Sequence, residues 1–357
     1  MGAETLRVGI VGLGANTRLR HVPGLRACAD VEIVAVANRR PESTAAAAKE
    51  FGIPQTFEHW QDLVADPQLD AVVIGTWPNL HCPVTLAALA AGKHVLCEAR
   101  MALNAAEARA MHEASRQRPE LVCQVVPSPM GLGVHRVVRE MIDSGYLGQL
   151  REAVVLATSD VYADAQQPLH WRQVADLSGV NTLTLGIVHE TLLRWASEPV
   201  RVLAQREAFT LERVDPASGM RRRVGTPDSV QVLATLADGA KGLYHVSGVT
   251  RFGPGTQIHL YGSEGTIKVE LAPQERVLVA RRGDSQLQEV AVPTEKRGGW
   301  RVEAEFIGAI RGENKIEFTD FADGVKYMEF TEAVARSAAA GAAVELPLEE
   351  QTENSKA

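Results

Sequence analysis

Several features that define other protein classes are scarce or missing in this sequence of 357 residues. It has only four cysteines and no CxxC pair, which argues against a disulfide scaffold and favours buried thiols in a reducing cytoplasm. No apolar run approaches the roughly 20 residues that a membrane-spanning helix needs. No charged-then-apolar leader opens the chain, so we expect a soluble, cytoplasmic protein. Acidic residues outnumber basic ones, and the net charge of −7 argues against nucleic acid or an anionic membrane as the main partner.

Familiar catalytic spacings are missing as well. The ten histidines show neither HxH nor HExxH spacing, so we expect no metal site. Ser247 and Ser263 lie in no nucleophile elbow, which leaves serine chemistry unsupported. What is present is ordinary for a globular protein, with 45% hydrophobic and 23% charged residues. A chain of this length predicts two domains with conventional cores.

The first part of the chain alternates short apolar runs with helical patterns, which predicts a doubly wound parallel sheet covered on both faces. One helix, Arg18–Ala29, is expected to present Leu19, Val22 and Leu25 on one face. Asn104 and Glu107 have the spacing of a capping box. The expected strands are Leu6–Val11, Val31–Ala37, Asp70–Thr76, His94–Glu98 and Leu121–Val126, and the other helices are Ser43–Phe51, Pro83–Ala91 and 104 to about 116.

After a bridging helix at Val134–Ser144, strand-like runs follow one another with short turns, which predicts an α+β domain with a largely antiparallel open sheet. We therefore expect a dinucleotide-binding Rossmann domain at 1–126, a substrate-binding and oligomerisation domain at 127–350, and a polar tail at 351–357. The strand-like runs are Arg151–Thr158, Val200–Thr210, Ser229–Leu236, Gly242–Val249, Gln257–Tyr261 and Thr266–Glu270, and the final helix is Asp323–Ala340.

A glycine-rich turn connects the first expected strand to the first expected helix. Gly12 and Gly14 supply the first two glycines of G-x-G-x-x-G, one for the tight turn and one for close approach of a pyrophosphate. The next residues, Ala15, Asn16 and Thr17, would present free backbone N–H groups to the phosphates. Thr17 replaces the third glycine, so we expect a slightly wider crossing of strand and helix. The strand before and the helix after favour nucleotide binding over a plain turn.

The end of the second expected strand bears on which cofactor binds. An acidic residue there would hold the 2′-hydroxyl of NAD, whereas arginine suits the 2′-phosphate of NADP. This sequence has Asn38, Arg39 and Arg40. Asn38 does not repel a phosphate, and guanidinium groups bind one with two parallel hydrogen bonds. NADP is therefore favoured over NAD, unless both arginines are only solvated surface charges.

Together these motifs resemble the family of glucose–fructose oxidoreductase, inositol dehydrogenase and MocA-like proteins, from about Leu6 to Pro347. The resemblance implies a Rossmann domain followed by an open antiparallel sheet, and oxidation or reduction of a sugar, polyol or related carbonyl compound with NAD or NADP. It implies that Thr76, Asn79, His81 and Glu98 also contact the cofactor. The matching segments are the glycine loop with His21 and Pro23, Thr76–His81, Ala91–Glu98, Gly145–Gly148, His170–Arg172, Gly186–His189 and Asp323–Val325.

Two departures from the family pattern concern its catalytic residues. The family usually reads Glu-Lys-Pro where this chain reads Glu98-Ala99-Arg100, so alanine occupies the position of the lysine. Arg100 stays protonated and is a poor general base, although it could stabilise an oxyanion or bind a substrate carboxylate. The family also has an aspartate four residues before its histidine, where this chain has Leu185, or Thr184 if the alignment shifts by one.

The remaining candidates come from the second half of the chain. His189 is suited to proton exchange at neutral pH, and its alternative is a hydrogen-bonded core histidine. Arg100 and Arg172 are candidate orienting groups in catalysis. Tyr162 and His170 lie in the stretch that usually lines the family's substrate pocket, and each could instead serve loop packing. Arg221–Arg223 is more simply explained as a solvated hairpin than as an anion site.

The sequence thus predicts an NAD(P)-dependent oxidoreductase that transfers hydride to or from a small sugar, polyol or related substrate. Because two acid/base groups are missing, a dinucleotide-binding sensor or partner subunit without turnover is the first alternative. The second is an epimerase or lyase that retains NAD. An exposed sheet face in the second domain would be a large apolar patch, so we expect a homodimer or homotetramer through it.

Overall fold

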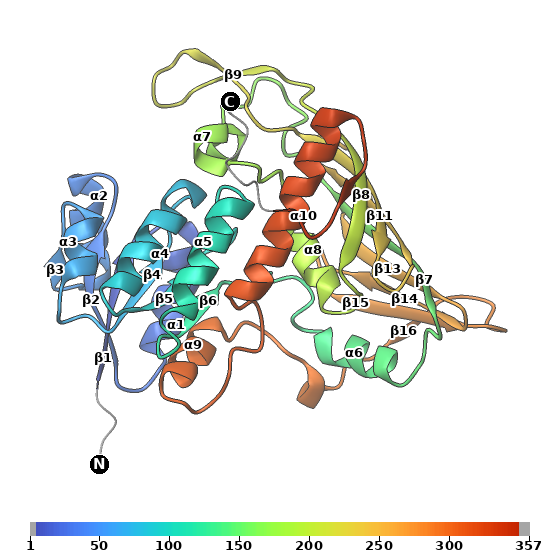
Figure 1. The fold of residues 1–357 in the computed structure, drawn as a ribbon, viewed down its shortest axis with the longest axis horizontal. Helices are drawn as coiled ribbons and strands as arrows, with labels where there is room; N and C mark the ends of the chain where they lie inside the picture. The colour runs from blue at the N-terminus through green and yellow to red at the C-terminus, as the bar shows by residue number, and fades with distance from the viewer. Residues whose placement is uncertain (1–4, 350–357) are drawn as a thin grey trace. The chain divides into compact units, whose positions relative to one another are not determined.

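The computed structural model describes residues 5–349 and divides the chain into two compact units (Figure 1). The first unit contains the described residues up to Pro127, together with Asp176–Gly179 and Trp300–Met328. The second contains Ser128–Ala175, Val180–Gly299 and the described residues from Glu329 onward. The polar tail expected at 351–357 lies outside the described residues.

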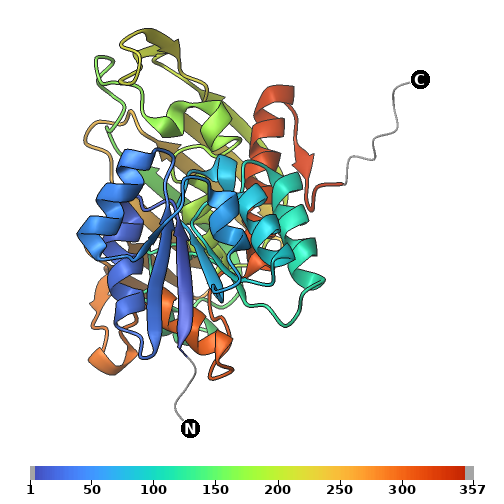
Figure 2. The ribbon, with the colours of Figure 1, turned by 90° about the vertical axis from the view of Figure 1, so that its left-hand side faces the viewer.

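The first unit is built on a six-stranded sheet in which every neighbouring pair is parallel. The order β3-β2-β1-β4-β5-β6 is that of a Rossmann fold, with the chain reversing direction across the sheet between β1 and β4. Figure 2 shows the N-terminal strands, in blue, with helices to either side. The strands are β1 Leu6–Val11, β2 Val31–Ala37, β3 Gln55–Thr56, β4 Ala71–Ile74, β5 His94–Cys97 and β6 Cys123–Val125.

Three of the four helices expected in this unit, α2, α4 and α5, begin and end within two residues of their expected bounds, whereas α3 was not expected. Asn104 caps α5 by accepting from Glu107 N at 2.9 Å, and the Glu107 carboxylate accepts from Leu103 N, so the capping interaction is confirmed. The helices are α2 Pro41–Phe51, α3 Trp60–Ala65, the 3₁₀ turn Pro78–Leu80, α4 His81–Ala90 and α5 Ala105–Arg116.

The expected helix Arg18–Ala29 differs from the prediction. The segment winds as a π-helix over Thr17–His21 and continues as α1, Val22–Arg26. The wider π-helical turn changes which side chains face the sheet. Val22 and Leu25 are buried as expected, but Leu19 is 69% exposed, so its expected place on the apolar face was wrong.

A late segment of the chain completes the first unit. Helix α9, Val302–Ile310, buries Val302, Phe306 and Ile307 in the same core as β1, β2 and α1. The sequence prediction assigned these residues to the second domain. The apolar spacing of α9 indicates a buried face, but not which core the face joins.

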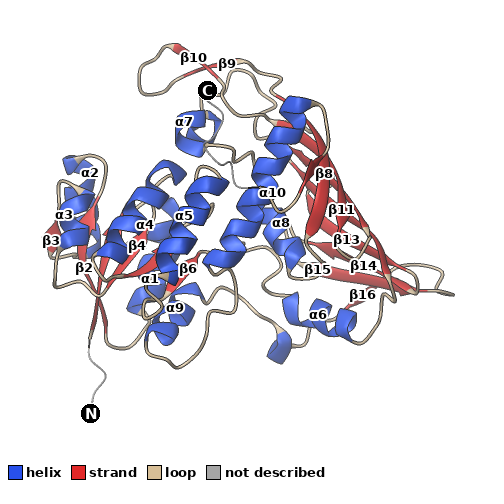
Figure 3. Ribbon diagram, in the orientation of Figure 1, coloured by secondary structure: helices blue, strands red, loops and turns tan. Residues whose placement is uncertain are grey.

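The second unit contains a nine-stranded sheet (Figure 3), in the order β16-β15-β14-β13-β7-β12-β11-β8-β17. All pairs are antiparallel except the central pair of β7 and β12, so the expected largely antiparallel sheet is confirmed. The strands are β7 Leu150–Thr158, β8 Pro199–Glu207, β11 Ser229–Leu236, β12 Lys241–Ser247, β13 Thr256–Gly262, β14 Gly265–Glu270, β15 Arg276–Arg281, β16 Gln288–Val290 and β17 Val344–Glu345.

The remaining elements of this unit pack beside the sheet or extend from it. Helix α8, Leu185–Leu193, contacts β7, whereas β9, Glu212–Val214, and β10, Arg221–Arg223, form a separate hairpin in which β10 is exposed and Arg213 of β9 is buried. The other helical elements are α6 His135–Asp143, the 3₁₀ turns Trp171–Gln173 and Thr294–Lys296, and the helices α7 Ala175–Ser178 and α10 Phe321–Ala340, which pass from one unit to the other along the chain.

One face of the nine-stranded sheet carries exposed leucines in register. Leu203 of β8 pairs with Leu233 of β11, which pairs with Leu243 of β12, and all three side chains are more than two-fifths exposed. This row lies on the sheet expected to mediate association. In the part of the chain that the structure describes, no helix is long and apolar enough to cross a membrane.

Candidate functional site

A cavity of about 690 Å³ opens in the first unit at the carboxyl ends of β1, β2 and β4. These strands flank the point where the strand order reverses, which is where doubly wound sheets bind nucleotides. The lining comes from the glycine loop, the end of β2, the segment after β3 and the turn after β4. The lining residues are Val11–Gly14, Arg18, Ala37–Arg40, Ser43, Glu58–Gln61, Gly75–Trp77, Asn79, Leu80 and Leu177.

The glycine loop comes too close to the next strand end for a side chain. Gly12 has φ +86°, and a Cβ placed there would lie 2.6 Å from Thr76 Cγ2. Thr17, which replaces the third glycine, is 1% exposed and packs over Gly75, with its Oγ1 donating to Gly12 O at 3.3 Å. Thr17 therefore closes the base of the loop and does not line the cavity. Helical residues begin directly after Gly14, at Ala15.

Asn38 joins the glycine loop to the start of α2. Its Oδ1 accepts from Leu13 N at 2.7 Å, and its Nδ2 donates to Ser43 O at 3.0 Å. Its backbone N donates to Thr44 Oγ1 at 2.9 Å. The side chain thus fixes the shape of the cavity wall with both ends of its amide. Sequence reasoning assigned Asn38 only a contact to the cofactor and missed this structural role.

The two arginines after β2 are exposed and line the cavity. The Arg39 guanidinium lies 5.0 Å from the centre of the Trp77 ring, and Arg40 is the N-cap residue of α2, with its carbonyl accepting from Thr44 N. Among the residues that the structure describes, the buried Oδ1 of Asn79 has no hydrogen-bond partner. The glycine loop leaves room for a dinucleotide phosphate, and Arg39 and Arg40 supply positive charge beside it. The buried Oδ1 of Asn79 can accept from a sugar hydroxyl.

Some expected cofactor residues do not line this cavity. His81 is fully buried, with Nδ1 2.9 Å from Arg100 O and Nε2 3.1 Å from Thr76 O, so it lies between two backbone carbonyls instead. Burial lowers the pKa of His81, so the ring is neutral at physiological pH. Ala15 and Asn16 are exposed at the start of the helix, and Asn16 Nδ2 donates to the Glu98 carboxylate.

Glu98 belongs to a buried chain of polar groups that sequence reasoning missed. Its Oε1 lies 2.9 Å from His21 Nε2, and His21 Nδ1 lies 2.6 Å from Glu303 Oε1. Trp300 Nε1 donates to Glu303 Oε2 at 2.9 Å. Burial lowers the pKa of His21, but the hydrogen bonds with Glu303 and Glu98 outweigh burial and raise it to about 9. His21 is therefore an imidazolium between two carboxylates at neutral pH.

The residues after Glu98 are where the chain departs from the family pattern. Ala99 N donates to Glu98 Oε2 at 3.2 Å, and the side chain of Arg100 is buried, with 4% of the residue exposed. An arginine in this place carries a permanent positive charge, which fits an electrostatic role and not that of a base. Its role in catalysis stays a prediction.

In the second unit, His189 lies in a packed interior. Its Nδ1 is 2.9 Å from the Tyr244 hydroxyl, and its ring stacks on Phe330 with centroids 3.6 Å apart. Burial lowers the pKa of His189 to about 3. The expectation of a histidine that titrates near neutrality is therefore corrected, because this environment keeps the ring neutral. The geometry matches the alternative of a hydrogen-bonded core histidine.

The other three candidates of the second unit lie close together. The rings of Tyr162 and His170 are 6.5 Å apart, and Arg172 stacks on Trp171 at 4.4 Å. His170 Nδ1 accepts from Arg172 N, and Arg213 Nη2 donates to Tyr162 O at 2.7 Å. Burial and the charge of Arg172 lower the pKa of His170. The structure therefore brings Tyr162, His170 and Arg172 into one cluster.

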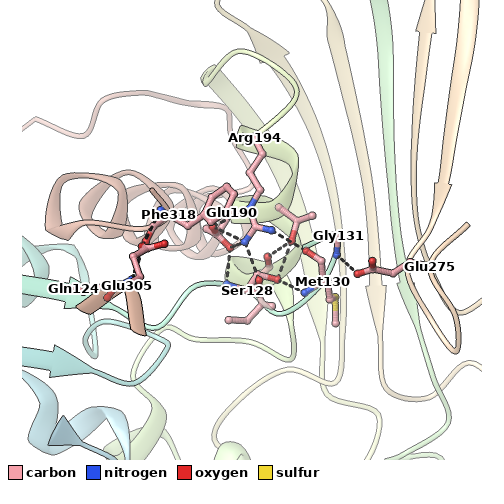
Figure 4. A network of polar contacts seen from close by, with 11 residues as sticks. Gln124, Ser128, Met130, Gly131, Glu190, Arg194, Glu275, Glu305 and Phe318 are labelled. Atoms are coloured by element: carbon pink, nitrogen blue, oxygen red, sulfur yellow. Dashed lines mark hydrogen bonds and ion pairs between the residues drawn. The ribbon is translucent and has the colours of Figure 1, made fainter. Parts of the chain in front are cut away.

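The carboxylate of Glu190, next to His189, is engaged in a network of hydrogen bonds and an ion pair (Figure 4). It forms a buried ion pair with Arg194 at 2.9 Å and accepts from Ser128 N at 2.8 Å. Arg194 also donates to Ser128 O and Met130 O. This network holds the 128–131 segment against α8, as the sticks in Figure 4 show.

The cavity also includes residues that sequence reasoning missed. Glu58–Gln61 follows β3, and Leu177 comes from the short segment assigned to the first unit. Every parallel strand brings the loop after it to the same edge of the sheet, so the first group could have been placed here only if β3 had been recognised as a strand. The strand β3 has only two residues, too few for a recognisable apolar run.

Comparisons with known proteins agree with this architecture. Residues 6–125 match the model of an oxidoreductase family with an NAD-binding Rossmann fold, and residues 135–268 match the GFO/IDH/MocA C-terminal domain. The chain is 26% identical to levoglucosan dehydrogenase from Pseudarthrobacter phenanthrenivorans, over 87% of this chain and 89% of that protein. It is 29% identical to 1,5-anhydro-D-fructose reductase from Ensifer adhaerens, over 95% of this chain and 98% of that protein.

A solved structure of levoglucosan dehydrogenase in complex with NADH and levoglucosan has the same fold, with a TM-score of 0.87 at 23% identity, covering 97% of this chain and all of that one. The cavity, the sheet order and the two matched domains agree on one assignment: the chain belongs to the Gfo/Idh/MocA family of oxidoreductases with an NAD-binding Rossmann fold.

Proposed function

We propose that this NAD(P)-dependent oxidoreductase transfers hydride between a nicotinamide cofactor and a carbinol or carbonyl carbon of a small sugar or polyol. The cavity at the reversal point of the first sheet carries the proposal, because its glycine cradle and flanking cations suit a dinucleotide. Relatives named as a levoglucosan dehydrogenase and a 1,5-anhydro-D-fructose reductase support the substrate class.

When bound, the cofactor supplies the hydride acceptor or donor, and the protein binds, orients and manages one proton. In this proposal the backbone at Gly12–Ala15 holds the pyrophosphate, and Asn79 accepts from a sugar hydroxyl. Asn38 holds the loop in place through Leu13 N. Asn16 and Glu98 reach the cofactor from the loops after β1 and β5, and Thr76 from the loop after β4. His81, which is buried beside the Thr76 carbonyl, would act only by positioning this loop.

For the proton, we retain His189 as the candidate, with Arg100 and Arg172 as orienting groups and Tyr162 and His170 as substrate contacts. His189 Nε2 is the ring nitrogen left to exchange a proton, since Nδ1 is paired with Tyr244. Exchange in the free enzyme would use the neutral ring, because burial lowers its pKa to about 3. Arg100 would stabilise negative charge on the substrate oxygen in place of the family's lysine.

For the cofactor, we propose a preference for NADP over NAD. Arg39 and Arg40 line the cavity where the 2′-phosphate would lie. A charge-assisted hydrogen bond contributes about 1.5–3 kcal/mol, so NADPH is expected to bind at least about tenfold more tightly than NADH. The double variant Arg39→Ala/Arg40→Ala should erase most of this difference and leave NADH affinity nearly unchanged. Equal affinities in the unmutated protein would contradict the preference.

The activity is tested by incubating the purified protein with each oxidised cofactor and a panel of sugars and polyols, and with each reduced cofactor and keto-sugars. Absorbance of the reduced nicotinamide reports turnover. Tight cofactor binding without turnover on any substrate would contradict the proposal and favour a dinucleotide-binding sensor or partner subunit. A cofactor that co-purifies and never exchanges would favour an epimerase or lyase.

Two glycines provide a matched pair of variants for the cofactor cavity. Gly12 and Gly52 both have positive φ, but only at Gly12 would a Cβ collide with neighbouring atoms, and at Gly52 nothing lies within 4 Å. Gly12→Ala should abolish cofactor binding, whereas Gly52→Ala should only lower stability slightly. Equal effects of both on cofactor affinity would show that the cradle does not hold the phosphates.

A further inference from the structure

The buried chain of Glu98, His21 and Glu303 has a net negative charge that the hydride-transfer proposal does not use. His21 is fully buried and bonded at both ring nitrogens, while the side chains of Glu98 and Glu303 are 14% and 3% exposed. One imidazolium between two carboxylates gives these three side chains a net charge of −1. A buried charge is expensive to keep unless the protein stabilises it, and here the hydrogen bonds of His21, Asn16 and Trp300 do so.

The position of Glu98 in the sheet indicates which half of a dinucleotide it would face. The first half of a Rossmann sheet, β1 to β3, holds the adenosine side, as the ribose contact after β2 shows. Glu98 directly follows β5, in the second half, and it accepts from Asn16, two residues after the glycine loop. Its carboxylate therefore lies on the nicotinamide side of the pyrophosphate loop.

We propose that the Glu98–His21–Glu303 chain is a fixed anionic group that favours the oxidised, positively charged nicotinamide over the reduced one, and so lowers the potential of the bound cofactor. This inference rests on the proposed function, since it needs a nicotinamide cofactor. In it His21 is a positioning residue: it keeps the Glu98 carboxylate ionised and fixed in direction.

The oxidised nicotinamide ring carries one positive charge that the reduced ring lacks, so a nearby anion stabilises the two forms unequally. One partly screened unit charge in a protein typically changes a binding equilibrium about fivefold to tenfold. A tenfold change in the ratio of the two dissociation constants corresponds to about 30 mV for a two-electron couple. The Glu98–His21–Glu303 chain is thus expected to raise the preference for the oxidised cofactor by this factor.

The charge of this chain should not vary near neutral pH. Burial raises the pKa of Glu98, but the hydrogen bond and charge of His21 outweigh burial and lower it, while the pKa of His21 is about 9. Burial keeps the neighbouring histidine and thiols neutral, because it lowers the pKa of the histidine and raises that of each thiol. These neighbours are His81 and Cys97 beside Glu98, and Cys28 beside Glu303.

The test is to titrate the full-length protein with NADP⁺ and NADPH, and with NAD⁺ and NADH, between pH 6 and 8, and to compare it with two amide variants. Glu98→Gln removes the charge nearest the cofactor. Glu303→Gln removes the charge farther from the cofactor, but glutamine can still accept hydrogen bonds from His21 and Trp300. It therefore provides a second test if Glu98→Gln fails to fold. Glu113→Gln, on the exposed face of α5, is the matched control.

Glu98→Gln should weaken binding of the oxidised form about fivefold to tenfold relative to the reduced form. Glu303→Gln should act in the same direction but less strongly, because the charge that it removes lies on the far side of His21, and Glu113→Gln should change nothing. An unchanged ratio in both variants, or an equal loss of both forms, would overturn the inference and leave a structural network only. If the unmutated protein binds no nicotinamide cofactor in either form, the proposed function itself fails.

Discussion

Asn38 offers a direct test of how the first unit shapes its cofactor cavity. Asn38→Ala removes the acceptor of Leu13 N, 2.7 Å away, and the donor to Ser43 O, 3.0 Å away. Leu13 is 4% exposed, so water cannot easily replace the lost acceptor. Leaving one buried donor unpaired costs about 1–3 kcal/mol, which is a factor of about 5 to 150 in the folding equilibrium.

Asn38→Asp separates this structural role from a direct contact with the cofactor ribose. The carboxylate would still accept from Leu13 N, but it would face the carbonyl of Ser43 without a hydrogen to donate. We therefore expect lower stability and weaker binding of both NADH and NADPH. If Asn38 acted mainly on the ribose, aspartate would instead tighten NADH and weaken NADPH.

Urea unfolding and fluorescence titration with both cofactors measure the two effects, with Gln117→Ala on the exposed end of α5 as an amide control. Unchanged stability in Asn38→Ala, together with opposite changes of NADH and NADPH affinity in Asn38→Asp, would refute the reasoning. A parallel fall of stability and of both affinities is the expected result.

Three further predictions concern other parts of the chain. The pKa of His21 is about 9 in the folded protein against an ordinary 6.5, which corresponds to a stabilisation of about 3 kcal/mol. This stabilisation is complete below pH 6.5 and is lost as the pH rises through 9. The unfolding free energies of the unmutated protein and of His21→Gln should therefore converge at pH 10. His189 should produce no break near pH 6.5 in kcat/KM; a break there that His189→Gln abolishes would show that the ring titrates. We propose that the row of Leu203, Leu233 and Leu243 mediates association. Leu233→Lys should then shift a dimer toward monomer in light scattering, while the control Leu287→Lys should not. A monomeric unmutated protein would contradict this.

Much of the fold follows from local pattern. The strands Leu6–Val11 and Ser229–Leu236 have the bounds that their apolar runs predict, because burial on a sheet dictates the residue types directly. The predicted burial of Leu19 was wrong, because a π-helical turn rotates side chains away from the α-helical spacing. Such a turn depends on contacts of the whole segment and leaves no periodic signal.

The site was less predictable than the fold. The glycine loop and the residues after β2 could be found because the motif states their chemistry. The partner of His21 could not, because Glu303 lies 282 residues further along the chain. Similarly, the amide of Asn38 has two partners that only the folded backbone brings near, so residue type alone suggested a ligand contact.

The placement of α9 has a consequence for biosynthesis. The core of the first unit needs Val302, Phe306 and Ile307, yet its sheet is complete once β6 ends at Val125. At about 5 to 20 residues per second, a ribosome needs about 10 to 40 s to add the intervening residues. During that time the growing chain exposes the apolar surface that α9 later covers. A nascent chain halted in this interval would be a natural client for chaperones, and release of α9 from the ribosome would end that dependence.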